Sequence, residues 1–87
     1  VLNVAFMITF QREDSILIDE YITILTDSGL AARRPMDDWE LLKNMILGSN
    51  LLVTARLDGK LVGFLRGLSD NCYRCFVADL AVAKDFQ

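Results

Sequence analysis

The dipeptide Asp58-Gly59 is the feature that most constrains the fold of this sequence. This pair favours a two-residue hairpin turn, in which both central residues adopt positive φ. The turn lies between two apolar stretches of strand length, residues 51–57 and 60–68. The sequence therefore predicts a tight antiparallel hairpin in the second half of the chain.

A first helix is predicted before this hairpin. Apolar residues recur at the i, i+3, i+4 and i+7 spacing of an amphipathic helix, namely at Ile18, Tyr21, Ile22 and Leu25. Either Asp14 or Ser15 can cap the start of the helix, and Gly29 can end it. We therefore expect one amphipathic helix between this cap and Gly29.

A second helix is predicted after Pro35, which cannot continue the first. Its buried stripe is expected to comprise Trp39, Leu42 and Ile46, with Met45 beside it. Asp37 and Glu40 have the spacing of a capping box. Gly48 is expected to stop the helix.

The remaining strands complete an α+β fold in a single domain spanning residues 1–87. The apolar run 1–9, bounded by the polar segment 11–14, predicts the first strand. After a turn at Asp70-Asn71, residues 72–82 predict the last strand. The order β-α-α-β-β-β predicts a four-stranded antiparallel sheet, with both helices between strands one and two.

Composition excludes several classes of protein. A net charge of −3 without a basic run argues against nucleic-acid binding. No apolar stretch approaches the roughly 20 residues of a membrane span. Two cysteines make no disulfide framework, so a reducing cytoplasm is the expected location. Hydrophobic residues make up 53% of this short chain, so it is expected either to expose some of them or to pair with another chain.

The sequence offers few metal ligands. It contains no His, which is the commonest general base and metal ligand. Cys72 and Cys75 form a Cys-x-x-Cys motif, but a zinc site needs two more ligands. Because both cysteines are expected in one strand, their side chains should point to opposite faces. No metal site is predicted.

The final segment, Asp79-Leu80-Ala81-Val82 followed by a polar turn and Gln87, resembles a strand-to-loop junction of the GCN5-related N-acetyltransferases. The resemblance covers essentially the whole chain, because further pieces match in order, namely Leu52-Val53-Thr54-Ala55-Arg56, Asp58-Gly59-Lys60-Leu61-Val62-Gly63 and Ser69-Asp70. It implies the front half of the acetyltransferase fold. It also implies transfer of an acetyl group from acetyl-CoA to a primary amine of an unidentified acceptor.

The resemblance assigns cofactor binding to the end of the last strand. In the family, this strand splays from its neighbour, so its backbone groups bind the pantetheine arm and direct an N–H at the thioester oxygen. The matching residues are Leu80, Ala81 and Val82. Gln87 matches the residue that opens the Gly-rich pyrophosphate loop. Because the sequence given stops there, activity is expected of a full-length parent and not of these 87 residues.

The catalytic base is assigned less directly. Asp79 is the carboxylate nearest to the presumed thioester, which makes it the candidate base. The alternative interpretation is a strand-end carboxylate that binds a nearby backbone group or Arg. The family's general acid is often a Tyr on a later helix, and neither Tyr21 nor Tyr73 matches that position.

The acceptor stays open. Eight acids lie in residues 13–40, and an acidic rim would attract a cationic amine. Solvated helix faces and caps explain the same charges. Arg33 and Arg34 would instead suit an acceptor that carries a carboxylate.

Two further expectations concern an alternative function and self-association. A non-catalytic α+β binding or structural module is the alternative function. A homo-oligomer is expected, because the last strand should present an apolar face comprising Phe76, Ala78, Leu80 and Val82.

Overall fold

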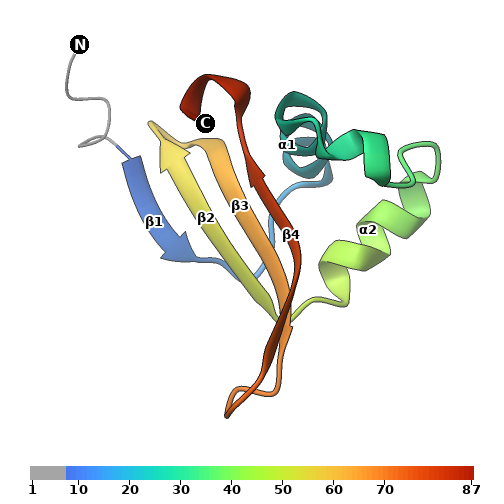
Figure 1. Cartoon of the computed structure of the whole chain (residues 1–87), viewed down its shortest axis with the longest axis vertical. Helices are drawn as coiled ribbons and strands as arrows, with labels where there is room; N and C mark the ends of the chain where they lie inside the picture. Colours follow the sequence, from blue (N-terminus) through green and yellow to red (C-terminus); the bar gives the residue numbers. More distant parts are fainter. Residues whose placement is uncertain (1–7) are drawn as a thin grey trace.

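The computed structural model describes residues 8–87 and confirms the predicted α+β order. Its elements are β1 (Ile8–Arg12), α1 (Ile18–Ser28), η2 (Leu30–Arg33), α2 (Trp39–Leu47), β2 (Leu51–Leu57), β3 (Lys60–Ser69), β4 (Cys75–Val82) and η3 (Lys84–Phe86), where η marks a 3-10 turn. The strands form one antiparallel sheet in the order β1-β2-β3-β4 (Figure 1). Within residues 8–87, no helix has the length and apolar character needed to cross a membrane.

The central hairpin forms as predicted. Asp58 has φ 50° and Gly59 has φ 86°, so both turn residues adopt left-handed backbone. Leu57 pairs with Lys60 directly across the turn. This two-residue connection fixes the register of β2 against β3.

The turn between β3 and β4 is longer than expected. Asp70 Oδ1 accepts hydrogen bonds from the backbone N–H groups of Cys72, Tyr73 and Arg74, at 2.9, 2.8 and 3.0 Å. These bonds hold residues 72–74 in the turn, so β4 begins at Cys75 and not at Cys72. The expectation that Cys72 and Cys75 lie in one strand with their side chains on opposite faces is therefore wrong.

Strand β1 extends further than predicted at its end. Residues 1–7 of the predicted strand 1–9 lie outside the described residues. Gln11 and Arg12, which were expected to bound the strand, belong to it. They pair with Thr54 and Val53 of β2, so the pairing places them in the strand although their polar side chains suggested a loop.

Helix α1 has a different start from the one predicted. Leu17 occupies the N-cap position, and its backbone N–H donates to Glu20 Oε1 at 3.1 Å. Neither Asp14 nor Ser15 caps the helix, so that prediction is wrong. The predicted end at Gly29 is confirmed, with φ 88°. The buried face of α1 comprises Tyr21, Ile24 and Leu25, while Ile18 and Ile22 are half-buried.

Helix α2 begins one residue later than the expected capping box. Asp38 is the N-cap, and its side chain accepts a hydrogen bond from Leu41 N at 3.0 Å. Leu42 and Ile46 are buried as predicted. Trp39 is 48% exposed, and the Lys43 ammonium lies 5.2 Å from its ring centre. The prediction that Trp39 belongs to the buried stripe of this helix is therefore wrong.

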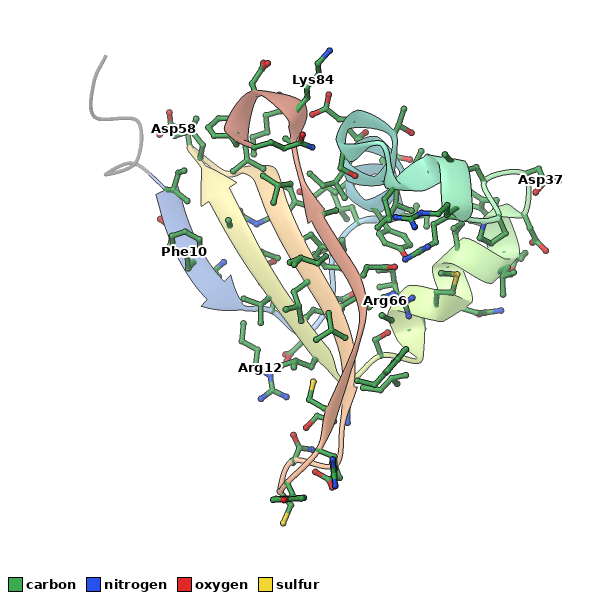
Figure 2. The ribbon with its side chains drawn as sticks, viewed as in Figure 1. Phe10, Arg12, Asp37, Asp58, Arg66 and Lys84 are labelled. Atoms are coloured by element: carbon green, nitrogen blue, oxygen red, sulfur yellow. The ribbon has the colours of Figure 1, made fainter. Side chains whose placement is uncertain are left out.

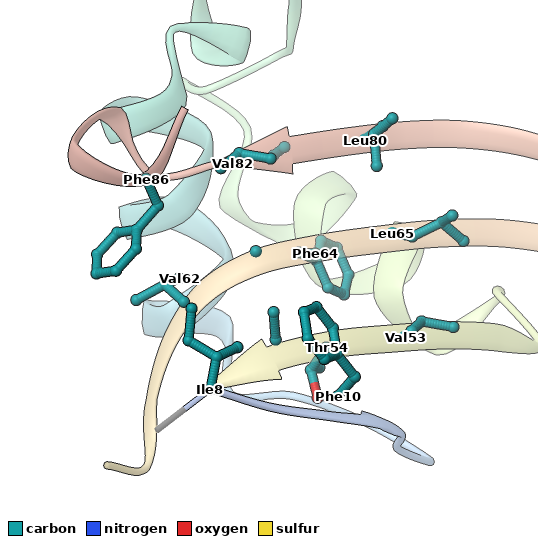
Figure 3. Close-up of a pocket in the computed structure, with 13 residues that line it drawn as sticks. Ile8, Phe10, Val53, Thr54, Val62, Phe64, Leu65, Leu80, Val82 and Phe86 are labelled. Carbon is teal, nitrogen blue, oxygen red and sulfur yellow. The ribbon is translucent and has the colours of Figure 1, made fainter. Parts of the chain in front are cut away.

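The helices cover only one face of the sheet. Tyr21 on α1 packs edge-on against Phe64 of β3, with ring centres 5.6 Å apart. The opposite face, here called the open face, carries apolar side chains from all four strands, namely Ile8, Phe10, Val53, Leu65, Leu80 and Val82 (Figure 3). Phe10 is 73% exposed and Leu80 is 68% exposed. Within the part of the chain that the structure describes, neither α1 nor α2 covers the open face, and Phe86 of η3 lines one side of the cavity over it (Figure 3).

A β-bulge divides β4 into two parts. Arg66 pairs with Asp79, whereas the next residue, Gly67, pairs with Val77, which leaves Ala78 as the extra residue. An inserted residue shifts the alternation of side chains by one. Phe76 therefore lies on the opposite face from Leu80, and the expectation that residues 76, 78, 80 and 82 share one face is wrong.

Candidate active site

The end of β4 is a free edge of the sheet. Ala83 N donates to Val62 O at 2.8 Å, so the backbone of Ala83 points toward β3. Backbone groups alternate along an antiparallel strand, so Ala81 also points toward β3, while Leu80 and Val82 point away from it. No strand lies beyond β4 in the described sheet. Leu80 and Val82 therefore present their N–H groups outward.

Two cavities flank this strand end. The first, here called the edge cavity, has a volume of about 410 Å³ and is lined by Ser28, Gly29, Leu30, Arg33, Leu80, Ala81, Val82 and Gln87. The second, of about 310 Å³, lies over the open face and also touches residues 80–82 (Figure 3). Residues 80–82, the predicted cofactor-binding triplet, thus separate the edge cavity, which has polar lining residues, from the apolar cavity over the open face.

Gln87 lies against the triplet that it was predicted to work with. Its side-chain amide nitrogen donates to Val82 O at 2.8 Å and to Ser28 O at 3.4 Å. The turn before it is fixed to α1, because Lys84 N donates to Asp27 Oδ2 at 2.9 Å. The structure therefore brings all four predicted cofactor-binding residues to one place.

Asp79 points the other way, into the layer between the sheet and the helices. Its side chain is fully buried and accepts four hydrogen bonds from three residues, with donors Tyr21 Oη (2.5 Å), Arg34 Nε (2.8 Å), Arg34 Nη2 (2.7 Å) and Arg66 Nε (2.6 Å). Figure 2 shows Arg66 extending from β3 toward the helices. The bulge contributes as well, since Arg34 Nη2 also donates to Ala78 O at 2.9 Å.

These contacts set the ionisation of the cluster. Burial alone raises the pKa of Asp79, but the hydrogen bonds from Arg66, Tyr21 and Arg34 outweigh it and hold the pKa below its usual value. Burial and the neighbouring carboxylate raise the pKa of the Tyr21 phenol, which stays protonated. Asp79 is therefore a carboxylate at neutral pH with all its bonds directed inward. Its role as a base stays a prediction.

The residues around Asp79 were only partly visible in the sequence. Tyr21 was identified as a core position, and Arg34 as one half of a connector. Arg66 was not identified. The available signal was an arginine two residues after Phe64 on the same face of an apolar strand, where burial requires a carboxylate partner.

A second ion cluster accounts for two of the eight acids. Arg56 Nε lies 2.7 Å from Glu13 Oε2, and Arg56 Nη1 lies 2.6 Å from Glu20 Oε2. The Thr54 hydroxyl also donates to Glu13. The hydrogen bonds from Arg56 lower the pKa of Glu13 to about 2. These acids join β1, β2 and α1 and do not form a rim for a cationic acceptor.

Two more acids have structural partners, since Asp38 caps α2 and Asp27 binds Lys84 N. None of the eight acids lines the edge cavity. Among residues 8–87, no group of three or more His, Cys, Asp or Glu side chains is placed to hold a metal ion. Cys72 is an exposed free thiol on the β3–β4 turn, and Cys75 is an exposed free thiol at the first residue of β4.

Comparisons with known proteins identify the fold. No protein-family model and no curated protein matches the sequence. A probable acetyltransferase from meticillin-resistant Staphylococcus aureus has a similar structure, with a TM-score of 0.74, 18% identity and coverage of 93% of this chain. A GNAT-family acetyltransferase from Streptococcus pneumoniae gives a TM-score of 0.70, 22% identity and 93% coverage.

The chain spans 57% and 56% of the lengths of those two structures. At these identities the similarity concerns the fold alone. The chain therefore shares, over nearly all its length, the α+β fold found in part of these two acetyltransferase structures.

Proposed function

We propose that a protein containing this chain transfers an acetyl group from acetyl-CoA to a primary amine. The observation that carries the proposal is the free edge of β4 beside the edge cavity. There, Leu80 and Val82 direct N–H groups away from β3. The fold shared with two acetyltransferase structures supports the same function.

The edge suits an extended ligand that carries amides. Outward groups on residues 80 and 82 are spaced by about 7 Å along a strand, because each residue rises about 3.3 Å. The pantetheine arm can bind such an edge as an added strand does, through main-chain hydrogen bonds. Val82 O is already occupied by Gln87, so the two N–H groups and Leu80 O are the groups assigned to the ligand.

The same N–H groups supply the chemistry. The neutral amine nitrogen attacks the thioester carbonyl carbon, the C–N bond forms, and the carbonyl oxygen gains negative charge. A backbone N–H aimed at that oxygen stabilises the charge without reorganisation. The C–S bond then breaks, coenzyme A leaves as the thiolate, and the proton lost by the amine neutralises it.

We assign Asp79 a positioning role in this reaction and not that of the base. Its lowered pKa makes it a weak proton acceptor, and its oxygens are held by Tyr21, Arg34 and Arg66. By fixing the β4 residue that precedes the triplet, it holds Leu80–Val82 in place. The acceptor then loses its proton to water, and the pH–rate profile should follow the pKa of the amine.

Replacing Val82 by proline tests the proposal in the protein that contains this chain. The substitution removes an outward N–H and leaves the bonds of Ala81 and Ala83 to β3 intact, which an edge position tolerates. We expect the acetyl-CoA dissociation constant, measured by calorimetry, to rise about tenfold, as loss of one hydrogen-bond donor predicts.

The matched control is Val82→Ala, which shortens the side chain and keeps the N–H. This variant should bind acetyl-CoA almost as the unmodified protein does. Equal affinity of the proline and alanine variants would refute the assigned edge. A protein that binds no acetyl-CoA at all would support the non-catalytic module instead.

A further inference from the structure

The adjacent arginines 33 and 34 have different environments in the structure. Arg34 is half-buried, and its guanidinium donates to Asp79 and to the carbonyls of Arg33 and Ala78. Arg33 is exposed and lines the edge cavity. Among residues 8–87, no carboxylate lies within ion-pair distance of Arg33. Its charge is thus available to a ligand in that cavity.

The charged side chain that lines the edge cavity is a cation. Arg33 is the charged side chain among the residues that line it. Behind Ala81, the buried cluster contains the two cations Arg34 and Arg66 against the single carboxylate Asp79, with Tyr21 protonated. Asp27, which precedes the lining residue Ser28, accepts a hydrogen bond from the backbone N–H of Lys84 and does not itself line the cavity.

We propose that the acceptor carries a carboxylate in addition to its amine, and that Arg33 binds this carboxylate in the edge cavity, beside the strand edge assigned to the pantetheine arm. The inference rests on the proposed function and names the substrate class for the same site. A guanidinium matches a carboxylate through two parallel N–H···O bonds, which orients the acceptor as well as binding it. A polycationic acceptor would meet Arg33 and the excess charge of the buried cluster.

The positive surroundings also favour the reactive form of the amine. A nearby cation disfavours protonation of an amine and lowers its pKa. This effect matters here because Asp79, the carboxylate that precedes the triplet, has its bonds directed inward. Acceptor binding at Arg33 would therefore contribute to specificity and to deprotonation together.

The test compares two matched acceptors in the protein that contains this chain. One is an amino acid with a free carboxylate, such as β-alanine, and the other is a diamine of similar length, such as 1,3-diaminopropane. We expect kcat/KM to favour the carboxylate compound. Arg33→Gln should raise the KM of that compound about tenfold and leave the KM of acetyl-CoA unchanged.

Controls separate the site from a general charge effect. Arg74→Gln removes the same charge at the β3–β4 turn, where the Arg74 guanidinium stacks on Tyr73 at 4.9 Å, and it should leave both KM values unchanged. Arg33→Lys should recover only part of the loss, because an ammonium binds a carboxylate through one donor at a time.

Three outcomes would overturn the inference. Equal or better use of the diamine would show that the cavity does not select a carboxylate. A rise in the KM of acetyl-CoA alone would show that Arg33 binds a phosphate of the cofactor. If neither compound nor any other amine is acetylated although acetyl-CoA binds, the proposed function fails and this inference fails with it.

Discussion

Replacing Asp79 by asparagine should destabilise the chain far more than its conservative size suggests. The substitution keeps the shape of the side chain and removes the charge that compensates Arg66 and Arg34, whose side chains are 11% and 19% exposed. Removing one partner of a buried ion pair costs about 3–5 kcal/mol. Arg34 can turn partly toward water and the asparagine oxygen retains one acceptor, so we expect about 3 kcal/mol.

This loss is large for an 87-residue chain, whose total stability should be about 4–13 kcal/mol. Urea unfolding followed by circular dichroism measures it. With a slope of about 1.5 kcal/mol per M, the midpoint should fall by about 2 M. Tyr21→Phe removes a single hydrogen bond to the same carboxylate and should cost about 1.5 kcal/mol.

A double replacement separates the ion pair from simple packing. Asp79→Leu combined with Arg66→Met leaves no unpaired charge between those two positions and should be less destabilising than Asp79→Asn alone. If Asp79→Asn lowers the stability by less than about 1 kcal/mol, the carboxylate is not buried against the two arginines. The assignment of Asp79 to a positioning role would then be wrong.

Three further predictions use other parts of the molecule. Glu13 has a pKa of about 2 against an ordinary 4.5, so its contribution to the free energy of unfolding is complete above pH 4.5 and is lost as the pH falls toward 2. Glu13→Gln should flatten this part of the stability–pH curve, and an unchanged curve would contradict the ion pair between Glu13 and Arg56. The 87-residue chain should be dimeric or larger in sedimentation at micromolar concentration, and Phe10→Asp on the open face should dissociate it; a monomer before substitution would disprove this association. The 87 residues alone should bind acetyl-CoA more weakly than micromolar and should not turn it over, since they span 57% of an acetyltransferase structure of the same fold; micromolar affinity in calorimetry would contradict the expected weak binding.

The sequence predicted the elements of the fold better than their ends. Asp58-Gly59 and Gly29 require positive φ, which is a local property, and both positions were identified correctly. The start of α1 was not, because Leu17 owes its place to the Glu20 side chain and to packing. The start of β4 was displaced because the Asp70 carboxylate organises three amides of the turn.

The site was predictable only where it depends on backbone. The triplet at residues 80–82 is recognisable because it ends a strand, and its neighbour Gln87 lies close in sequence. The partners of Asp79 lie 58, 45 and 13 residues away, at Tyr21, Arg34 and Arg66. A single sequence contains no signal for contacts at such separations beyond the requirement that a buried charge be paired.

Because of the extra residue Ala78, the side chains that face one side of the sheet have odd numbers in one part of β4 and even numbers in the other. Before the bulge, at Cys75 and Val77, the odd-numbered side chains point to the open face. After the bulge, at Leu80 and Val82, the even-numbered side chains do. A deletion at Ala78 would therefore join Val77 directly to Asp79 as a regular strand, in which every side chain keeps the face that it has now. A deletion at a regular position such as Leu80 would instead move the side chains on one side of it to the other face of the sheet. Variation in the length of the β3–β4 turn itself, in contrast, would leave the phase of residues 79–82 untouched.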